Sequence, residues 1–171
     1  MSAQTAVSTA GRSPQFGDLI PIVWIGFLAG TLDITENLVS NQFRGVNAKM
    51  VFQYIASGLI GARSFQLGAI SIALGVIIHY AIAYFWTTAY YALSRKRSIL
   101  LRRPVISGLL YGVVVYLIMN FVVLPLSGVP HPHKPVTIAS RISDVLALMF
   151  CIGLTISLLI RRMSARRLNN I

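Results

Sequence analysis

Three of the four acidic residues in this chain lie inside long apolar stretches, where ionisable side chains are rare. They are Asp33, Glu36 and Asp144. A charge within membrane hydrocarbon costs at least about 2.5 kcal/mol on insertion scales, so each of these residues needs an internal partner or a function. His79 lies inside a further apolar stretch. Because carboxylates beside a histidine can exchange a proton, these residue types indicate a site for protons or cations.

The stretches that carry these residues predict a membrane protein. Hydrophobic residues make up 56% of the chain and charged residues only 11%, against about 25% charged residues in a typical soluble domain. A helix needs about 20 residues to cross the hydrocarbon. Four stretches have this length, at about 18–39, 66–93, 104–126 and 139–160. We therefore expect an all-α integral membrane protein, a four-helix transmembrane bundle that forms a single domain over 18–161.

The segments outside the spans are shorter. Two polar segments lie at the ends of the chain, a leader at 1–17 and a basic tail at 162–171. Between the first two spans, the segment 47–61 has apolar or small residues on one helical face, namely Met50, Val51, Tyr54, Ile55 and Gly58. At about 15 residues it is too short to cross a bilayer, so we expect a short interfacial helix.

Basic residues are concentrated in the connection between the second and third spans and in the tail. They are Arg95, Lys96, Arg97, Arg102, Arg103, Arg161, Arg162, Arg166 and Arg167. Because cytoplasmic loops carry an excess of Lys and Arg, this pattern places both termini in the cytoplasm. The same side chains are expected to contact anionic lipid headgroups. Trp86, Tyr90 and Tyr91, near the same end of the second span, are expected to be aromatic anchors at the membrane interface.

The polar residues of the spans are predicted to lie at one depth. Counted from the cytoplasmic ends, four of them fall at about 21 to 26 Å. They are Asp33, His79, Asn120 and Asp144. Glu36 lies one turn further out than Asp33, and Tyr116 one turn before Asn120. These six residues form the predicted polar layer.

Asp33 and Glu36 could lie shallow enough in the membrane to reach water; otherwise two interpretations of the polar layer stay open. In the first it is a site that binds a proton or a cation. In the second it is a structural clamp, in which Asp33 or Asp144 accepts hydrogen bonds from His79, Asn120 and Tyr116 and fixes the register of the helices. Small residues along each span, such as Gly30, are expected to bring the helices close enough for either role.

Other kinds of chemistry find little support. The net charge of +11 is distributed beside the ends of the spans rather than over one face, so nucleic-acid binding is not predicted. The chain has one cysteine, Cys151, and therefore no intramolecular disulfide. His131 and His133, separated by Pro132, are weak candidates for binding a metal. No cofactor is predicted, and the familiar enzyme motifs are absent, so enzymatic activity is not expected although an active site assembled across helices stays open.

One part of the chain resembles a known group of proteins. The stretch from Ser107 to Gly112 reads SGLLYG, and the stretch from Asn120 to Gly128 reads NFVVLPLSG before a proline-rich turn. In these residues the chain resembles the uncharacterised YagU-like small inner-membrane proteins of bacteria, mainly over 104–160. The resemblance implies the bacterial cytoplasmic membrane and carries over no catalytic residue.

The sequence thus leads to two functional hypotheses. The first is an accessory or structural component of the cytoplasmic membrane. The alternative is a proton- or cation-coupled transporter or channel that acts as an oligomer through the polar layer. Under either hypothesis we expect the lipid bilayer as a partner, and a homo-oligomer or a larger membrane complex, because four short spans enclose little space.

Overall fold

All regular elements in the described part of the chain are helices. The computed structural model describes residues 16–130 and 137–168, except for the side chains at 16–18 and 166–168. Four stretches are long and apolar enough to cross a membrane: Leu19–Phe43, Ala69–Lys96, Pro104–Leu126 and Ile138–Ala165. The predicted fold class, an all-α membrane bundle of four spans, is therefore confirmed.

The first two spans are each one continuous helix, α1 (Phe16–Phe43) and α3 (Ala69–Lys96). α1 continues past the predicted end at 39, because helical hydrogen bonds do not require apolar side chains. It ends where Gly45 adopts a φ of +75° and the Val46 N–H donates back to the Asn41 carbonyl at 2.9 Å. Glycine adopts this left-handed conformation at little cost, which makes it a common helix terminator.

The third and fourth spans both change from α-helix to π-helix part of the way along. The third consists of α5 (Pro104–Ile118), η2 (Met119–Val123) and α6 (Leu124–Leu126). The fourth consists of α7 (Ile138–Ala147), η3 (Leu148–Leu154) and α8 (Thr155–Leu168). η2 and η3 are π-helical segments, which are rare and often occur at functional sites.

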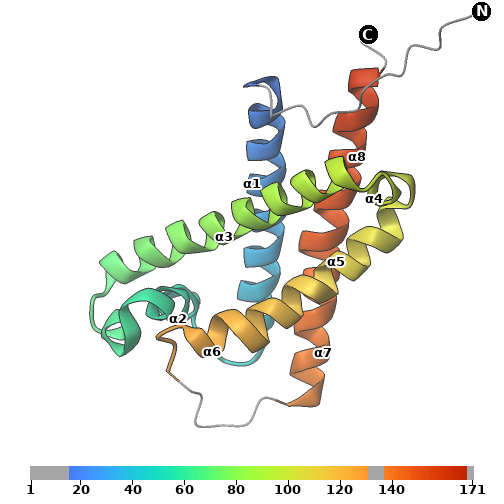
Figure 1. Cartoon of the computed structure of the whole chain (residues 1–171). Helices are drawn as coiled ribbons and strands as arrows, with labels where there is room; N and C mark the ends of the chain where they lie inside the picture. Colours follow the sequence, from blue (N-terminus) through green and yellow to red (C-terminus); the bar gives the residue numbers. More distant parts are fainter. Residues whose placement is uncertain (1–15, 131–136, 169–171) are drawn as a thin grey trace, which may run out of the picture.

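The four spans do not form a bundle of near-parallel helices. α1 and the α7–α8 span run roughly side by side, and α3 and α5 cross them obliquely (Figure 1). α3 packs on α1, whereas α5 packs on η3 and α8. The short helix α4 (Ile99–Arg102) connects α3 to α5. We call this end of the molecule the basic end, because Arg95, Arg103 and Arg161 lie there.

Glycines bring the third and fourth spans into close contact. A Cβ atom added at Gly112 would overlap the backbone of Leu148 and Met149, and one added at Gly153 would overlap the backbone of Gly108 and Gly112. Backbones that approach this closely gain van der Waals contact, which drives helix association where no water is present. The predicted role of the small residues is confirmed at this contact.

The segment between the first two spans forms α2 (Ala48–Ile60), followed by the 3-10 helix η1 (Gly61–Phe65). α2 packs against α3, where the Phe52 carbonyl fills the space beside Gly75. The Gly128 N–H donates to the Gly58 carbonyl at 3.0 Å, so α2 joins α3 to the end of the third span. On the predicted apolar face, Val51 is buried, but Met50 and Tyr54 are exposed. Ala56 and Ser57, which were not on that face, are buried as well.

Four aromatic residues meet near the basic end. They are Trp86, Tyr90, Tyr91 and Tyr111, the aromatic cluster. The first three are buried, with exposed fractions of 8%, 0% and 5%. The prediction that they are anchors at the membrane interface is wrong, because α3, α5 and α8 converge here and enclose them.

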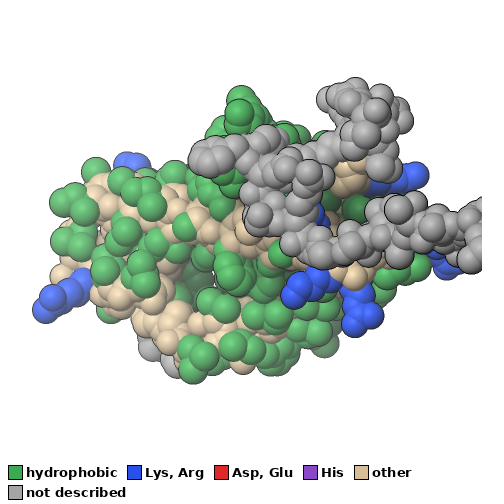
Figure 2. All heavy atoms as spheres, turned by 45° about the horizontal axis from the view of Figure 1, so that its top comes forward, with side chains coloured by type: hydrophobic (Ala, Val, Ile, Leu, Met, Phe, Trp, Pro, Cys, Tyr) green, Lys and Arg blue, Asp and Glu red, His purple; other side chains and the backbone are tan. Residues whose placement is uncertain are grey.

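Apolar side chains cover much of the outside of the molecule. Figure 2 shows hydrophobic side chains over a large part of one face, with Lys and Arg side chains grouped towards the two sides of the view. Ile77, Phe85, Leu110 and Phe121 are each more than 60% exposed. In a bilayer such side chains face the lipid tails, as expected for spans whose small and polar residues point inward.

Candidate functional site

The deepest acidic residue of the predicted layer, Asp33, lies on α1 and is half-buried. Glu36 follows one turn later, and the two carboxylates lie close enough to interact electrostatically. The neighbouring hydroxyls do not donate hydrogen bonds to these carboxylates. Thr31 Oγ1 donates to the Phe27 carbonyl at 2.8 Å, and Thr35 Oγ1 donates to the Thr31 carbonyl at 2.7 Å. Both hydroxyls thus donate to their own helix, and Thr31 Oγ1 also forms a hydrogen bond with the Tyr80 hydroxyl of α3 at 2.9 Å. The Asp33 carboxylate accepts no hydrogen bond from any described residue.

The fourth span brings a third carboxylate to this region. Arg44, just after α1, donates to Asp144 on α7, with Nη2 and Oδ1 3.4 Å apart. The two side chains are 36% and 45% exposed, so this ion pair is long and open. Glu36 lies within electrostatic range of both partners. Asp33, Glu36 and Asp144 with Arg44 therefore form one group, the acidic cluster.

η3 forms the inner side of the acidic cluster. Cys151 lies two turns after Asp144 and within electrostatic range of Asp33 and Glu36. The Thr155 hydroxyl donates to the Phe150 carbonyl at 3.1 Å, five residues back, as the wider turn of a π-helix allows. The carboxylates of α1 thus face a part of the fourth span where the regular α-helical hydrogen bonding is interrupted.

His79 contacts α1 beside the acidic cluster. Its Nε2–H donates to the Gly30 carbonyl at 2.8 Å, and the side chain is only 9% exposed. The contact requires a small residue on α1, because a Cβ added at Gly30 would lie 2.9 Å from the Ala83 Cβ. Gly30 lies one turn from Asp33, so His79 is near the acidic cluster, but its described hydrogen bond is to the backbone.

The predicted polar layer is therefore divided. The structure brings together Asp33, Glu36 and Asp144. It places His79 against Gly30, which lies one turn from Asp33 on α1. Asn120 donates to the carbonyl of Tyr116 at 3.0 Å within its own span. Tyr116 is buried, and none of the described contacts joins Tyr116 or Asn120 to a carboxylate.

Two features of this region were not predicted from the sequence. Arg44 was not among the predicted site residues, and its partner Asp144 lies one hundred positions later in the chain. The only signal was a guanidinium within reach of a span that carries two carboxylates. The π-helical segments were also missed, because no residue pattern in them differs from that of an apolar α-helix.

The remaining predicted residues lie away from the acidic cluster or outside the described part. Arg95 donates to the Tyr91 hydroxyl at 3.0 Å and lies over its ring. The other described basic residues of this end are exposed: Lys96, Arg97, Arg102, Arg103, Arg161 and Arg162. The side chains of Arg166 and Arg167 lie outside the described part, as do His131 and His133. Among the described residues, no three His, Cys, Asp or Glu side chains are arranged to hold a metal ion.

Comparison with known proteins adds no further assignment. The chain matches no protein-family model, no curated protein and no solved structure. The resemblance to YagU-like proteins stays a prediction.

Proposed function

We propose that this membrane protein binds and moves protons at the acidic cluster, as a proton-coupled transporter or a proton channel that acts as an oligomer. The observation that supports the proposal is the convergence of three carboxylates, Asp33, Glu36 and Asp144, from two spans. Of the two functional hypotheses, this arrangement favours the transporter or channel over the accessory or structural component. The hydrogen bonds of a clamp, donated by His79, Asn120 and Tyr116 to the carboxylates, are not formed among the described residues.

The energetics of the acidic cluster favour a bound proton. A charge in hydrocarbon is costly, and neighbouring like charges raise the cost further. Arg44 supplies one positive charge for three carboxylates, and it pairs with Asp144 at the open side. A proton bound at Glu36 or Asp33 removes a negative charge that has no such partner. The cluster therefore lowers its energy by taking up protons.

A proton fits this arrangement better than a metal ion. A divalent cation such as Ca²⁺ requires six to eight oxygen ligands at about 2.3–2.6 Å. No described group of acidic side chains is close enough for that. A proton needs one carboxylate oxygen at a time. We therefore assign the proton, and not a chelated metal, as the transported or coupled species.

The exposure of the cluster suggests a direction of entry. Arg44 and Asp144 are more than a third exposed, whereas Asp33 lies deeper, one helical turn beyond Glu36. A proton entering beside Arg44 would bind Glu36 and pass to Asp33. Towards the basic end from Asp33, the α1 residues Ile22, Ile25 and Ala29 are buried in one core with the aromatic cluster. Onward movement of a proton therefore requires a conformational change or a second copy.

Proton flux into liposomes tests the proposal. We expect purified protein, reconstituted with a pH-sensitive dye inside the vesicles, to raise the proton flux at least about tenfold over protein-free vesicles. Asp33→Asn and Glu36→Gln should remove most of that increase. The matched control is Asp18→Asn, the same chemical change on α1 about 22 Å from Asp33.

Two results would overturn the proposal. One is a wild-type flux equal to that of empty vesicles, and the other is a flux that Asp33→Asn leaves unchanged. If the wild type is inactive and a second protein co-purifies with it in mild detergent, the accessory role is the better description.

The orientation and the membrane belong to the same proposal. The exposed basic residues at the end formed by α4 and α8 support a cytoplasmic location for that end and for both termini. The resemblance to YagU-like proteins supports the bacterial inner membrane. Reporter domains fused to each terminus, active on only one side of the membrane, test the orientation.

A further inference from the structure

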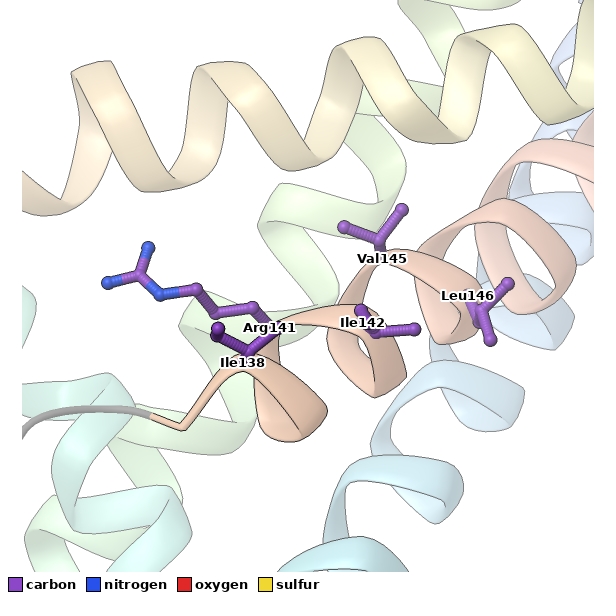
Figure 3. Close-up of a pocket in the computed structure, with 5 residues that line it drawn as sticks. All are labelled: Ile138, Arg141, Ile142, Val145 and Leu146. Carbon is purple, nitrogen blue, oxygen red and sulfur yellow. The ribbon is translucent and has the colours of Figure 1, made fainter.

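A shallow groove lies on the outer side of α7, away from the aromatic cluster. It has a volume of about 210 Å³ and is lined by Ile138, Arg141, Ile142, Val145 and Leu146 (Figure 3). The lining is apolar, so Arg141 contributes the aliphatic part of its side chain. Ile138, Ile142 and Leu146 are 77%, 55% and 46% exposed. The groove is therefore an open apolar surface depression along α7.

The charged end of Arg141 extends out of this groove. Figure 3 shows the guanidinium pointing past the start of α7, in the direction opposite to Leu146. The side chain is exposed and forms no ion pair or hydrogen bond with any described residue. Asp144, one turn further along α7, pairs with Arg44 instead. One end of the groove thus carries a positive charge that is available to a ligand.

We propose that this groove binds an anionic phospholipid from the leaflet in which α7 begins. The phosphate would accept hydrogen bonds from the Arg141 guanidinium, and an acyl chain would lie along Ile142, Val145 and Leu146. Arg141 and Leu146 are five residues apart, which is about 7.5 Å along the helix. The guanidinium lies towards the start of α7, and Ile142, Val145 and Leu146 lie deeper in the span, which is the polarity of a lipid in a bilayer.

This site differs from the lipid contacts predicted at the basic end. α7 begins at the opposite end of its span from Arg161 and Arg162, so the groove faces the other leaflet. It is also independent of proton movement at the acidic cluster. Phosphatidylglycerol has a net negative charge, whereas the choline group of phosphatidylcholine neutralises its phosphate, so a single basic side chain should favour phosphatidylglycerol.

A fluorescent reporter placed in the groove tests the proposal. The chain has two tryptophans, Trp24 and Trp86, which are first replaced by phenylalanine. Ile142→Trp then reports on the groove, and Leu110→Trp, on an exposed part of α5, serves as the reporter outside it. Each protein is placed in phosphatidylcholine vesicles that contain brominated phosphatidylglycerol, and separately in vesicles in which phosphatidylcholine carries the bromine. Quenching then gives the relative affinity for the two lipids.

We expect the reporter at 142 to favour phosphatidylglycerol about fivefold, the value for one basic side chain near the membrane surface, and the reporter at 110 to show little preference. Arg141→Gln should abolish the preference at 142, and Arg141→Lys should keep most of it. Arg63→Gln removes an exposed charge from η1 and should change nothing.

Three results would contradict lipid binding in the groove. Equal affinities for the two lipids at 142, or a preference that survives Arg141→Gln, would overturn the proposal. Displacement of the lipid by soluble glycerol phosphate would also overturn it, because the ligand would then be a free phosphate and the apolar part of the groove would play no role.

Discussion

The aromatic cluster, on α3 and α5, and the acidic cluster, on α1 and α7 with Arg44, treat their polar groups in opposite ways. In the aromatic cluster, the Tyr90 hydroxyl donates to Ser157 Oγ at 2.8 Å, and Ser157 Oγ donates to the Pro104 carbonyl at 2.6 Å. The Tyr111 hydroxyl donates to the Trp86 carbonyl at 2.7 Å. In the acidic cluster, the ion pair between Arg44 and Asp144 measures 3.4 Å and is open to the surroundings.

This difference separates the part of the molecule that holds the spans together from the part that is available for chemistry. Buried neutral groups with short hydrogen bonds stabilise a membrane bundle. Carboxylates that lie beside other carboxylates do not, and such groups persist where function requires them. We therefore expect substitutions near the aromatic cluster to affect stability, and substitutions in the acidic cluster to affect function.

The largest loss of stability is expected at the contact between α5 and η3, which positions both clusters. Gly112→Ala places a methyl group against the backbone of Leu148 and Met149, which cannot move aside as a flexible side chain could. We expect a loss of about 1 to 3 kcal/mol, measured by unfolding in detergent. Gly58→Ala is the control, because its Cβ would have 3.8 Å of space. An equal loss in both variants would show that the close contact is not specific.

A smaller loss is expected from the hydrogen bonds of the aromatic cluster. Tyr90→Phe removes the hydroxyl that joins α3 to α8 and keeps the buried ring. Hydrogen bonds between membrane helices contribute about 0.6 kcal/mol on average and up to about 1.7, and we expect a value near the upper end for this buried bond. Tyr84→Phe, on the same helix, removes a hydroxyl that bonds to no described residue and should have no effect on unfolding.

Substitutions of His79 test whether this residue, which lies beside the acidic cluster, contributes to stability or to proton movement. His79→Leu removes the hydrogen bond to the Gly30 carbonyl, and we expect a loss of about 0.6 kcal/mol. Because the described bond is structural, proton flux should fall far less than in Asp33→Asn. His79→Gln keeps a donor and should recover part of the stability. Complete loss of flux in both His79 variants would place the histidine in the proton path.

The smallest effect on stability is expected for the ion pair of the acidic cluster. The two partners are more than a third exposed, and pairs of this kind contribute little. Arg44→Gln should cost about 0.5 kcal/mol or less in unfolding measurements. Arg63→Gln controls for the loss of one positive charge. A loss as large as that of Tyr90→Phe would mean that the acidic cluster also holds the fold together.

The sequence predicted the spans and much of their close packing, because both follow from local residue types. Apolar length identifies a span, and small residues such as Gly108 and Gly112 identify the side that another helix can approach. The helix ends depended on Gly45 and Gly68, whose positive φ values were not anticipated.

The composition of the site could not be predicted in the same way. Counting residues along each span places Asp33, His79 and Asn120 at one depth only if all helices are similarly inclined. α3 and α5 cross the other spans obliquely (Figure 1), so equal counts do not give equal depths. The burial of Tyr90 and the pairing of Arg44 with Asp144 depend on contacts between distant segments, which no local pattern reports.

The central claim is that the carboxylates of the acidic cluster do not stabilise the fold. Thermal unfolding in detergent tests it most directly, with Asp33→Asn, Glu36→Gln and Asp144→Asn measured beside Tyr90→Phe. We predict that Asp33→Asn and Glu36→Gln unfold at the same temperature as the parent or above it, that Asp144→Asn loses no more stability than Arg44→Gln, and that Tyr90→Phe unfolds below the parent. Asp33→Asn unfolding as far below the parent as Tyr90→Phe would contradict the claim and identify the carboxylates as a structural clamp.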